Sequence, residues 1–365
     1  MAKHDFLTQF KSRLKRSLLP ARSSKEKGFT LLELLVVVGI ASGIIAGLMY
    51  IVVELMGTDQ RESSRSETQR EMQMAMDYIS TELREAVYVY TGDNLACAGL
   101  GGAGCSPLTA YLPPSLSNNS VPVIAFWKQE PFPNNVPAGS DRAKCYSSDP
   151  RQYQGIACLA GNSYALVVYS LSKANTNNIW STANARITRY ALTEFNSQGT
   201  LNQGYVNPGA FGNFATWPFG TDPNTATVAN LQNVAVLSGR PTGRPGTAPV
   251  VNPVTLVDFV DFGARTAATC PGTGTYSQSP TDGLLNSTPG FSGIRSFFAC
   301  ISVRPPLQNP VPGQQQQVDT GVNQDVILSV RGNANGRPGI IGDAFLPSLE
   351  TRVLSRGVLT KRPSD

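Results

Sequence analysis

Histidine is nearly absent from this chain of 365 residues, and its absence removes several classes of catalytic site. The only histidine is His4, which lies in a basic stretch at the N-terminus. The rest of the chain therefore has no imidazole for a Ser-His-Asp triad, a Cys-His dyad or a His-ligated zinc site. Catalysis by carboxylates or lysine alone is not excluded by this count.

Charged residues are also scarce, at 15% of the chain. Residues 1–28 hold eight Lys and Arg against two acidic residues, a net of +6, so the rest of this +5 protein carries −1. This balance excludes a globally basic surface that coats nucleic acid beyond residue 28, and it argues against strong generic binding to DNA, which needs clustered Lys and Arg. Glycine (34) and proline (26) are plentiful, which is typical of a loop-rich, mostly β fold.

One long apolar run lies near the N-terminus. From Leu34 to Val53, the only polar side-chain groups are those of Ser42 and Tyr50. About 20 apolar residues form a helix that crosses a bilayer core of ~30 Å. Basic residues precede the run, so the positive-inside rule predicts a cytoplasmic N-terminus and export of the chain that follows. A secretory signal or plain signal anchor is the alternative, but a secretory signal has a shorter apolar core.

A glutamate stands at the start of this run, in the segment KGFTLLELLVVV (residues 27–38). An acidic residue costs about 2.5 kcal/mol or more at the centre of a span and less near its end. No Lys or Arg lies three or four residues from Glu33 inside the span. We therefore expect its partner to be another chain or a chain terminus.

This segment resembles the type IV prepilin signature: a basic leader ending in glycine, then Phe-Thr-Leu, an apolar residue, glutamate and a long apolar helix. The resemblance implies that residues 1–28 are a leader, cleaved between Gly28 and Phe29 by a prepilin peptidase on the cytoplasmic face. It also implies N-methylation of Phe29 and pairing of Glu33 with the terminal amine of a neighbouring subunit. A carboxylate and an amine in a low-dielectric environment are each costly alone and tolerable as a pair.

Three glycines in the apolar run recur every four residues, at Gly39, Gly43 and Gly47. On a helix they form a stripe of small residues that allows another helix to approach closely in lipid or in a filament core. The alternative is that these glycines are merely tolerated in a membrane helix.

The chain after Met56 predicts an amphipathic helix. Residues 58–71 are polar, and apolar residues then recur at helical spacing. These residues are Met72, Met76, Ile79, Leu83, Val87 and Tyr90. We interpret them as core packing, not as a cofactor site, and expect the polar stretch to be solvated. The segments are then 29–56, a membrane or filament-core helix, and 57–90, a stalk helix continuous with it.

Residues 91–365 predict a β-rich head domain. Runs rich in β-branched and aromatic residues alternate there with Gly, Pro, Asn and Ser. The expected strands are 121–127, 164–171, 186–192, 231–237, 254–262, 294–303 and 325–330. The predicted fold class is α+β, with a long N-terminal membrane-spanning helix packed on an antiparallel sheet.

Six cysteines lie in the exported part, and none forms a Cys-x-x-Cys motif. An even number of cysteines in an oxidising compartment favours disulfides, and we expect sequential pairing because each bond closes a local loop. The expected pairs are Cys97–Cys105, Cys145–Cys158 and Cys270–Cys300. Free buried thiols are the alternative.

Candidate active or binding sites in the head are few. Asp258 and Asp261 are three apart, which on a regular strand puts them on opposite faces and makes a poor acid/base pair. The loop from Arg331 to Arg337 is either an anion site or a solvated turn. The aromatic residues that could stack on sugars or bases, or else pack in the core, are Trp127, Trp180, Trp217 and Tyr205.

The layout of the chain resembles the larger minor pilins and pseudopilins, called W-type or J-type. It resembles in particular the hormogonium polysaccharide secretion pseudopilins of cyanobacteria, through the patches AVYVY, AFWKQE, VRGNANGRPG and LSRGVLTK. The resemblance implies a non-enzymatic subunit without cofactor or metal. It would be held in the inner membrane with its head exported, then assembled into a pilus or pseudopilus, periplasmic or at the cell surface.

The implied partners are the prepilin peptidase, other pilins or pseudopilins and the inner-membrane assembly platform. The subunit would serve motility, DNA uptake or secretion. A head that binds polysaccharide or DNA cargo is the alternative, and a membrane-tethered enzyme is a third hypothesis.

Overall fold

The structure of the protein is a computed structural model. The residues that it describes are 28–97, 106–131, 162–175, 178–209, 214–234, 241–245, 253–265, 269–272, 274–303, 324–342 and 345–355. The chain divides into two compact units, one up to Thr58 and one from Asp59 onward. The fold class is α+β, as expected.

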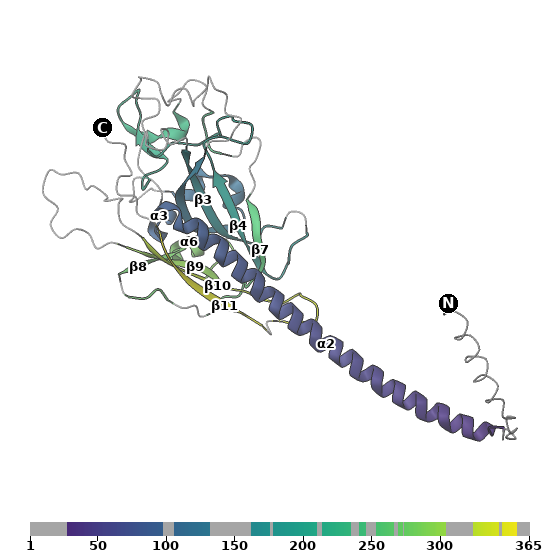
Figure 1. The fold of residues 1–365 in the computed structure, drawn as a ribbon. Coiled ribbons are helices and arrows are strands. Elements are labelled where there is room, and N and C mark those ends of the chain that lie inside the picture. The colour runs from purple at the N-terminus through teal and green to yellow at the C-terminus, as the bar shows by residue number, and fades with distance from the viewer. Residues whose placement is uncertain are drawn as a thin grey trace, which may run out of the picture. The chain divides into compact units, whose positions relative to one another are not determined.

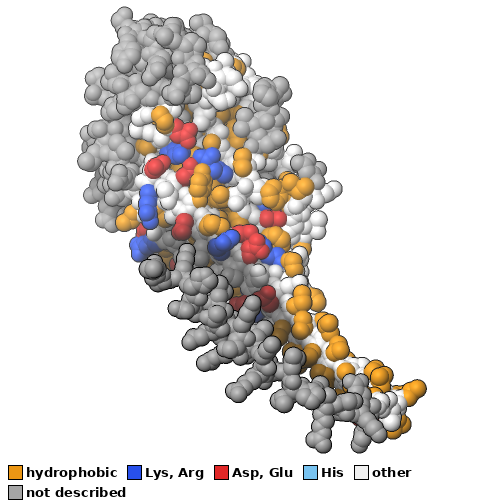
Figure 2. All heavy atoms as spheres, turned by 45° about the vertical axis from the view of Figure 1, so that its right-hand side comes forward, with side chains coloured by type: hydrophobic (Ala, Val, Ile, Leu, Met, Phe, Trp, Pro, Cys, Tyr) orange, Lys and Arg blue, Asp and Glu red, His pale blue; other side chains and the backbone are white. Residues whose placement is uncertain are grey.

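The first unit holds the N-terminal part of α2, the helix Leu31–Arg84. Thr30 caps this helix, because its hydroxyl accepts a hydrogen bond from the Glu33 N–H at 3.3 Å. The side chains from Leu31 to Met56 are exposed, and Figure 2 shows apolar side chains following one another along this segment. Among the described residues, α2 is the one helix long and apolar enough to cross a membrane.

The second unit begins with the later turns of α2, which bury one face. The buried residues are Ser64, Thr68, Met72, Ala75, Met76, Ile79, Ser80, Glu82 and Leu83. This spacing is that of one helix face, so the amphipathic packing predicted from Met72 onward is confirmed. The expectation of a solvated polar stretch is wrong for Ser64 and Thr68, whose hydroxyls donate to Pro338 O and Ser64 O.

The helix ends at Arg84, so the expectation of a helix to residue 90 is wrong. Residues Ala86–Val89 form strand β1 instead, paired antiparallel with β2, which spans Ser120–Pro131. Val87 and Tyr90 fit a helical spacing, but the β-branched and aromatic residues here also suit a strand. The neighbouring strand decides between the two, because pairing satisfies backbone groups such as Tyr90 N, which donates to Ala125 O.

Two antiparallel sheets form the head. One has the order β1-β2-β3-β4-β7, and the other β11-β10-β9-β8. The strands not yet bounded are β3 Asn162–Ser172, β4 Ala185–Leu192, β7 Val254–Val260, β8 Tyr276–Ser279, β9 Phe297–Ser302, β10 Asp325–Arg331 and β11 Ser348–Leu354. A small third sheet pairs β5 Phe219–Thr221 with β6 Val228–Asn230. The expectation of one sheet on the helix is thereby corrected to two.

Short helices fill connections between the strands. The α-helices are α3 Gly92–Ala96 and α6 Asp282–Ser287. The 3-10 helices are η1 Leu108–Tyr111, η2 Pro114–Leu116 and η3 Leu231–Asn233. The last of these corrects the first part of the strand expected over 231–237, because residues 231–233 form an Asn-capped 3-10 helix. Residues 235–237 lie outside the described residues.

The main core lies between α2 and the two sheets (Figure 1). It joins Met72 and Ile79 of the helix to residues such as Phe126 of the first sheet and Phe297 of the second. A second core on the opposite face of the five-stranded sheet includes Trp127. Alternate residues along β2 therefore serve different cores, and the sheet is buried on both faces.

Strand β7 departs from regular alternation. Phe259 has φ +60°, and the pairing with β4 shifts register on both sides of Val257. Both Val257 and Val260 consequently belong to the main core, whereas on a regular strand residues three apart face opposite sides. An extra residue on one strand causes this change, since it resets which side the next residue faces.

Candidate functional site

The Gly28–Phe29 bond lies just before the first turn of α2. Residues 28–30 are not helical, and the Phe29 side chain is 77% exposed. Because Thr30 caps the helix, helical structure begins at Leu31, two residues after this bond. The bond is thus in an exposed, non-helical stretch next to a rigid helix, which suits attack by a protease.

Glu33 lies in the first turn of the same helix. An acidic side chain there is favoured by the helix dipole. Among the described residues, no ion pair of the Glu33 carboxylate is found, which leaves this group for an outside partner. Sequence reasoning missed the capping role of Thr30, although the spacing of Thr30 and Glu33 is the capping-box pattern.

The three glycines of the apolar segment lie within α2. A Cβ atom added at Gly39, Gly43 or Gly47 would meet nothing within 4 Å in the described structure. The stripe is therefore open, and another helix can approach its backbone closely.

In the head, a buried ion cluster surrounds Glu82 near the end of α2. Lys128 Nζ donates to Glu82 Oε1 at 2.8 Å, and Arg189 donates to both carboxylate oxygens at 2.7 and 2.9 Å. The Tyr169 hydroxyl also donates to Glu82. These partners come from β2, β3 and β4, so the cluster fastens the helix to three strands.

Electrostatics keep this cluster charged. Burial would raise the pKa of Glu82, but hydrogen bonds from Arg189, Lys128 and Tyr169 outweigh burial and lower it from 4.5 to about 2. Burial likewise opposes the charge of Lys128, yet Glu82 and Glu130 raise its pKa above the usual value. A general acid or base works best when its pKa lies near the working pH, and the pKa values of Glu82 and Lys128 both lie far from neutral pH. We therefore interpret the cluster as structural.

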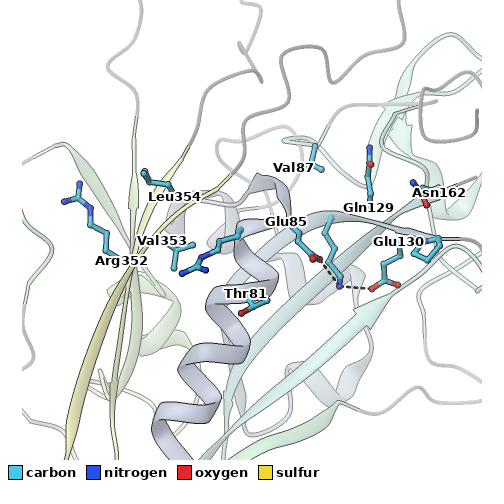
Figure 3. Close-up of a pocket in the computed structure, with 12 residues that line it drawn as sticks. Thr81, Glu85, Val87, Gln129, Glu130, Asn162, Arg352, Val353 and Leu354 are labelled. Carbon is cyan, nitrogen blue, oxygen red and sulfur yellow. Dashed lines mark ion pairs between the residues drawn. The ribbon is translucent and has the colours of Figure 1, made fainter. Parts of the chain in front are cut away.

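A cavity of about 1350 Å³ opens beside this cluster, between the end of α2, β2 and β11 (Figure 3). Lys128 is one of its lining residues and pairs with Glu130 at 3.2 Å and with Glu85 at 3.9 Å. The other lining residues are Thr81, Arg84, Val87, Gln129, Pro131, Asn162, Arg352, Val353 and Leu354. Lys128 is thus compensated by carboxylates. No cluster of three His, Cys, Asp or Glu able to hold a metal occurs in the described ranges.

The loop from Arg331 to Arg337 is neither a solvated turn nor a set of free arginines. Arg331 pairs with Asp261 at 2.9 Å, and Arg337 pairs with Glu67 at 2.7 Å and also with Glu71. Arg337 is buried, and its guanidinium lies 4.1 Å from the centre of the Phe259 ring. Both arginines thus attach the loop to the rest of the head, which corrects the expected turn.

Asp258 and Asp261 hold separate partners. Asp258 accepts a hydrogen bond from the Ser181 N–H at 2.7 Å, whereas Asp261 contacts Arg331. Two carboxylates occupied in this way do not form an acid/base pair.

Three of the four candidate aromatic residues are core residues. Trp127, Trp217 and Tyr205 are at most 1% exposed and lie in the second core. Trp180 is half-buried near Arg186. Packing in the core is therefore confirmed over stacking on a ligand for the buried three.

The disulfide between Cys270 and Cys300 is present, as predicted. Cys97 is also disulfide-bonded. Cys105, Cys145 and Cys158 lie outside the described residues, so the pairs 97–105 and 145–158 remain predictions.

Residues 23–49 match the family model of the prokaryotic N-terminal methylation motif. The match covers the end of the predicted leader, the Gly28–Phe29 bond, Glu33 and all three glycines. The chain thus carries the N-terminus of a type IV pilin-like precursor, of the kind that a prepilin peptidase processes. No curated protein and no solved structure matches the chain.

Proposed function

We propose that this protein is a minor pilin or pseudopilin, stored in the inner membrane and assembled into a type IV pilus or a related pseudopilus. The observation that carries the proposal is the placement of the matched motif. An exposed, non-helical Gly28–Phe29 bond is followed by a capped apolar helix, whose Glu33 carboxylate has no ion pair among the described residues. Prepilin peptidase, other pilins or pseudopilins and the assembly platform are its partners. The role is structural and non-catalytic.

Assembly follows from the exposed apolar helix. Removal of the leader creates a new amine at Phe29, four residues from Glu33, and both groups then lie just before the apolar run Leu34–Val53. Pairing Glu33 with the amine of a neighbouring subunit satisfies both charges in a low-dielectric surrounding. Packing against other such helices covers the exposed side chains and replaces lipid contacts with protein contacts.

The minor role rests on size. Cleavage after Gly28 leaves 337 of the 365 residues, most of them in the head. A head of this bulk is poorly suited to dense repetition along a shaft, and it favours a rare position such as the tip.

Cargo binding by the head is a second proposal. The cavity beside Lys128 offers hydroxyl, amide and carboxylate groups, from Thr81, Gln129 and Glu130 among others. Because Lys128 is already paired, this lining favours a hydroxyl-rich polysaccharide over the phosphates of DNA.

The main proposal is tested by separating cleavage from assembly. We expect Gly28→Ala to remain uncleaved when the full chain meets the peptidase, and Glu33→Ala to be cleaved but largely lost from sheared filaments. Glu54→Ala, which removes the other exposed carboxylate of the apolar helix, is the matched control and should be cleaved and assembled. Intact mass spectrometry reads cleavage, and immunoblots of sheared filaments read assembly. A wild-type chain whose mass is unchanged by the peptidase would overturn the proposal.

A further inference from the structure

One edge of the five-stranded sheet is open along most of its length. β7 is the last strand in this sheet, so β4 pairs with one side of it only (Figure 1). On the other side, the end of β7 is closed: Asp261 N donates to Arg331 O at 2.9 Å, and Phe259 O accepts from Asn333 N at 2.7 Å. From Val254 to Asp258, no backbone partner occurs on that side in the described ranges. This stretch can therefore pair with a further strand.

Other sheet edges in the head are protected against such pairing. On β1, at the opposite edge of the same sheet, the Gln324 amide donates to Val89 O and accepts from Val89 N, both at 2.9 Å. This side chain takes the place of a neighbouring peptide group. The edge strand β11 carries Glu350 and Arg352, and charged side chains discourage pairing with another chain. The segment Val254–Val257 of β7 carries no charge, and its first residue is 71% exposed.

A groove of about 610 Å³ follows this open edge. Five consecutive β7 residues, Thr255–Phe259, line it. Because alternate side chains of a strand point to opposite faces, a lining of consecutive residues indicates an edge and not a face. The facing walls are apolar and accessible: Met74 and Tyr78 of α2 are 54% and 46% exposed, and Ile179 is 70% exposed. The other lining residues are Glu71, Ala75, Trp180 and Arg337, and the whole groove lies in the second unit.

We infer that an extended segment of another protein binds in this groove and adds a strand to the edge of β7. The backbone of β7 identifies the class of partner, because an open strand edge needs N–H and C=O partners at the spacing of a strand. An extended polypeptide supplies them, whereas a helix or a sugar does not. The closure at Phe259 limits the added strand to the length of Val254–Asp258.

The walls of the groove set which side chains the partner carries. Every second side chain of the added strand would point toward α2 and pack on Met74 and Tyr78. Apolar residues at alternate positions are therefore favoured. This inference goes beyond the proposed function and does not depend on cleavage or on filament assembly, so the two can fail separately.

The test measures the binding of synthetic peptides to the full chain in detergent micelles by fluorescence anisotropy. The peptides are seven residues long, as β7 is, and alternate Val or Phe with Thr or Lys. Matched peptides carry N-methyl groups at the odd or at the even positions, which removes the N–H donors from one edge and keeps the side chains. On the protein, Met74→Lys alters the groove. Val228→Lys is the control, because Val228 is 55% exposed on β6 and does not line the groove.

We expect one of the two N-methylated sets to bind about tenfold more weakly, the effect of losing about two hydrogen bonds. Met74→Lys should weaken binding by about tenfold or more, because it removes apolar contact area, and Val228→Lys should leave binding unchanged. Equal binding by both N-methylated sets, or equal effects of the two lysine variants, would overturn the inference. Absence of binding by every peptide would also overturn it.

Hydrogen exchange read by mass spectrometry provides a second measurement on the same samples. The amides of Val254–Asp258 that face the open edge should exchange rapidly in the free protein and become protected when a peptide is bound. Protection in the free protein would overturn the inference and assign the edge to another segment of this chain. Protection that increases with protein concentration would instead assign it to a second copy.

Discussion

The two halves of α2 are one continuous helix with opposite surroundings. In the first half, Leu31–Met56, apolar side chains face every direction and remain exposed; Ile44 is 59% exposed. In the second half, polar residues are frequent, yet Met72 and Ile79 are fully buried. Helix formation is common to both, so the distribution of side chains around the axis sets their different roles.

The second half also shows that a polar composition does not by itself mean exposure to solvent. Ser64, Thr68 and Glu82 are all buried. Ser64 and Glu82 have hydrogen-bond partners in the head, and the Thr68 hydroxyl donates to Ser64 O in the preceding turn of the helix. A buried polar group is tolerated when it is hydrogen-bonded. In the first half the side chains from Leu31 to Met56 are exposed, and such a large apolar surface requires lipid or other subunits.

The largest loss of stability is expected when the Glu82 carboxylate is removed from the second half of α2. Glu82→Ala leaves Lys128 and Arg189 without their buried counter-charge, so we expect the free energy of unfolding to fall by about 3–5 kcal/mol. Chemical denaturation of the full chain in detergent measures this. Glu85→Ala is the control: Glu85 is 61% exposed and 3.9 Å from Lys128, so its loss should cost below about 1 kcal/mol. Similar losses for both variants would contradict a structural role of the cluster.

The same substitution at two points of the helix tests the comparison directly. Ile79→Ala should lower the free energy of unfolding of the head by about 2–5 kcal/mol, because Ile79 is fully buried in the main core. Ile44→Ala should change it by less than about 0.5 kcal/mol, because Ile44 lies in the other unit and is exposed. Denaturation followed by tryptophan fluorescence compares them. An equal effect would mean that the two units unfold together.

Lowering the pH should reduce the free energy of unfolding through carboxylates that contact the second half of α2 and the head. The pKa of Glu82 is lowered to about 2 in the folded protein, so its stabilising effect is complete above pH 4.5 and is lost between pH 4.5 and 2. We expect a loss of about 1–2 kcal/mol at pH 3 relative to pH 6 from this group. Asp325, whose pKa hydrogen bonding from Arg352 lowers, adds a loss of the same sign, whereas the raised pKa of Glu71 opposes it. Denaturation at both pH values measures the change, which Glu82→Gln should reduce. An unchanged loss in Glu82→Gln would assign the effect to other carboxylates.

Local sequence patterns were sufficient to predict much of the secondary structure of this protein. The apolar run predicts the first half of α2, the recurring apolar residues from Met72 predict its second half, and six expected strands correspond to β2, β3, β4, β7, β9 and β10. β11 escapes prediction because it is mostly polar and lies at a sheet edge, with Val353 as its buried side chain. A strand that is defined mainly by its pairing with a neighbouring strand has no clear apolar pattern from which it can be predicted.

The ion cluster was not predicted, because its members are far apart in the chain. Glu82 is separated from Lys128 by 46 residues, from Tyr169 by 87 and from Arg189 by 107. In the sequence, Glu82 resembles any polar residue of an amphipathic helix. Only the order of β2, β3 and β4 brings these three partners to one place.

Chain order alone was enough to predict the apolar segment and the recurring apolar residues that follow it in α2, because each pattern depends on residues within a few positions of one another. The end of α2, the division of the head into two sheets and the attachment of the Arg331–Arg337 loop were decided by tertiary contacts. Residues 86–90 can form either a helix or a strand, and the arginines can bind water or carboxylates. In each case the conformation depends on which distant segment of the chain lies alongside. Burial removes polar groups from water, and that segment must supply the hydrogen bonds that water no longer provides.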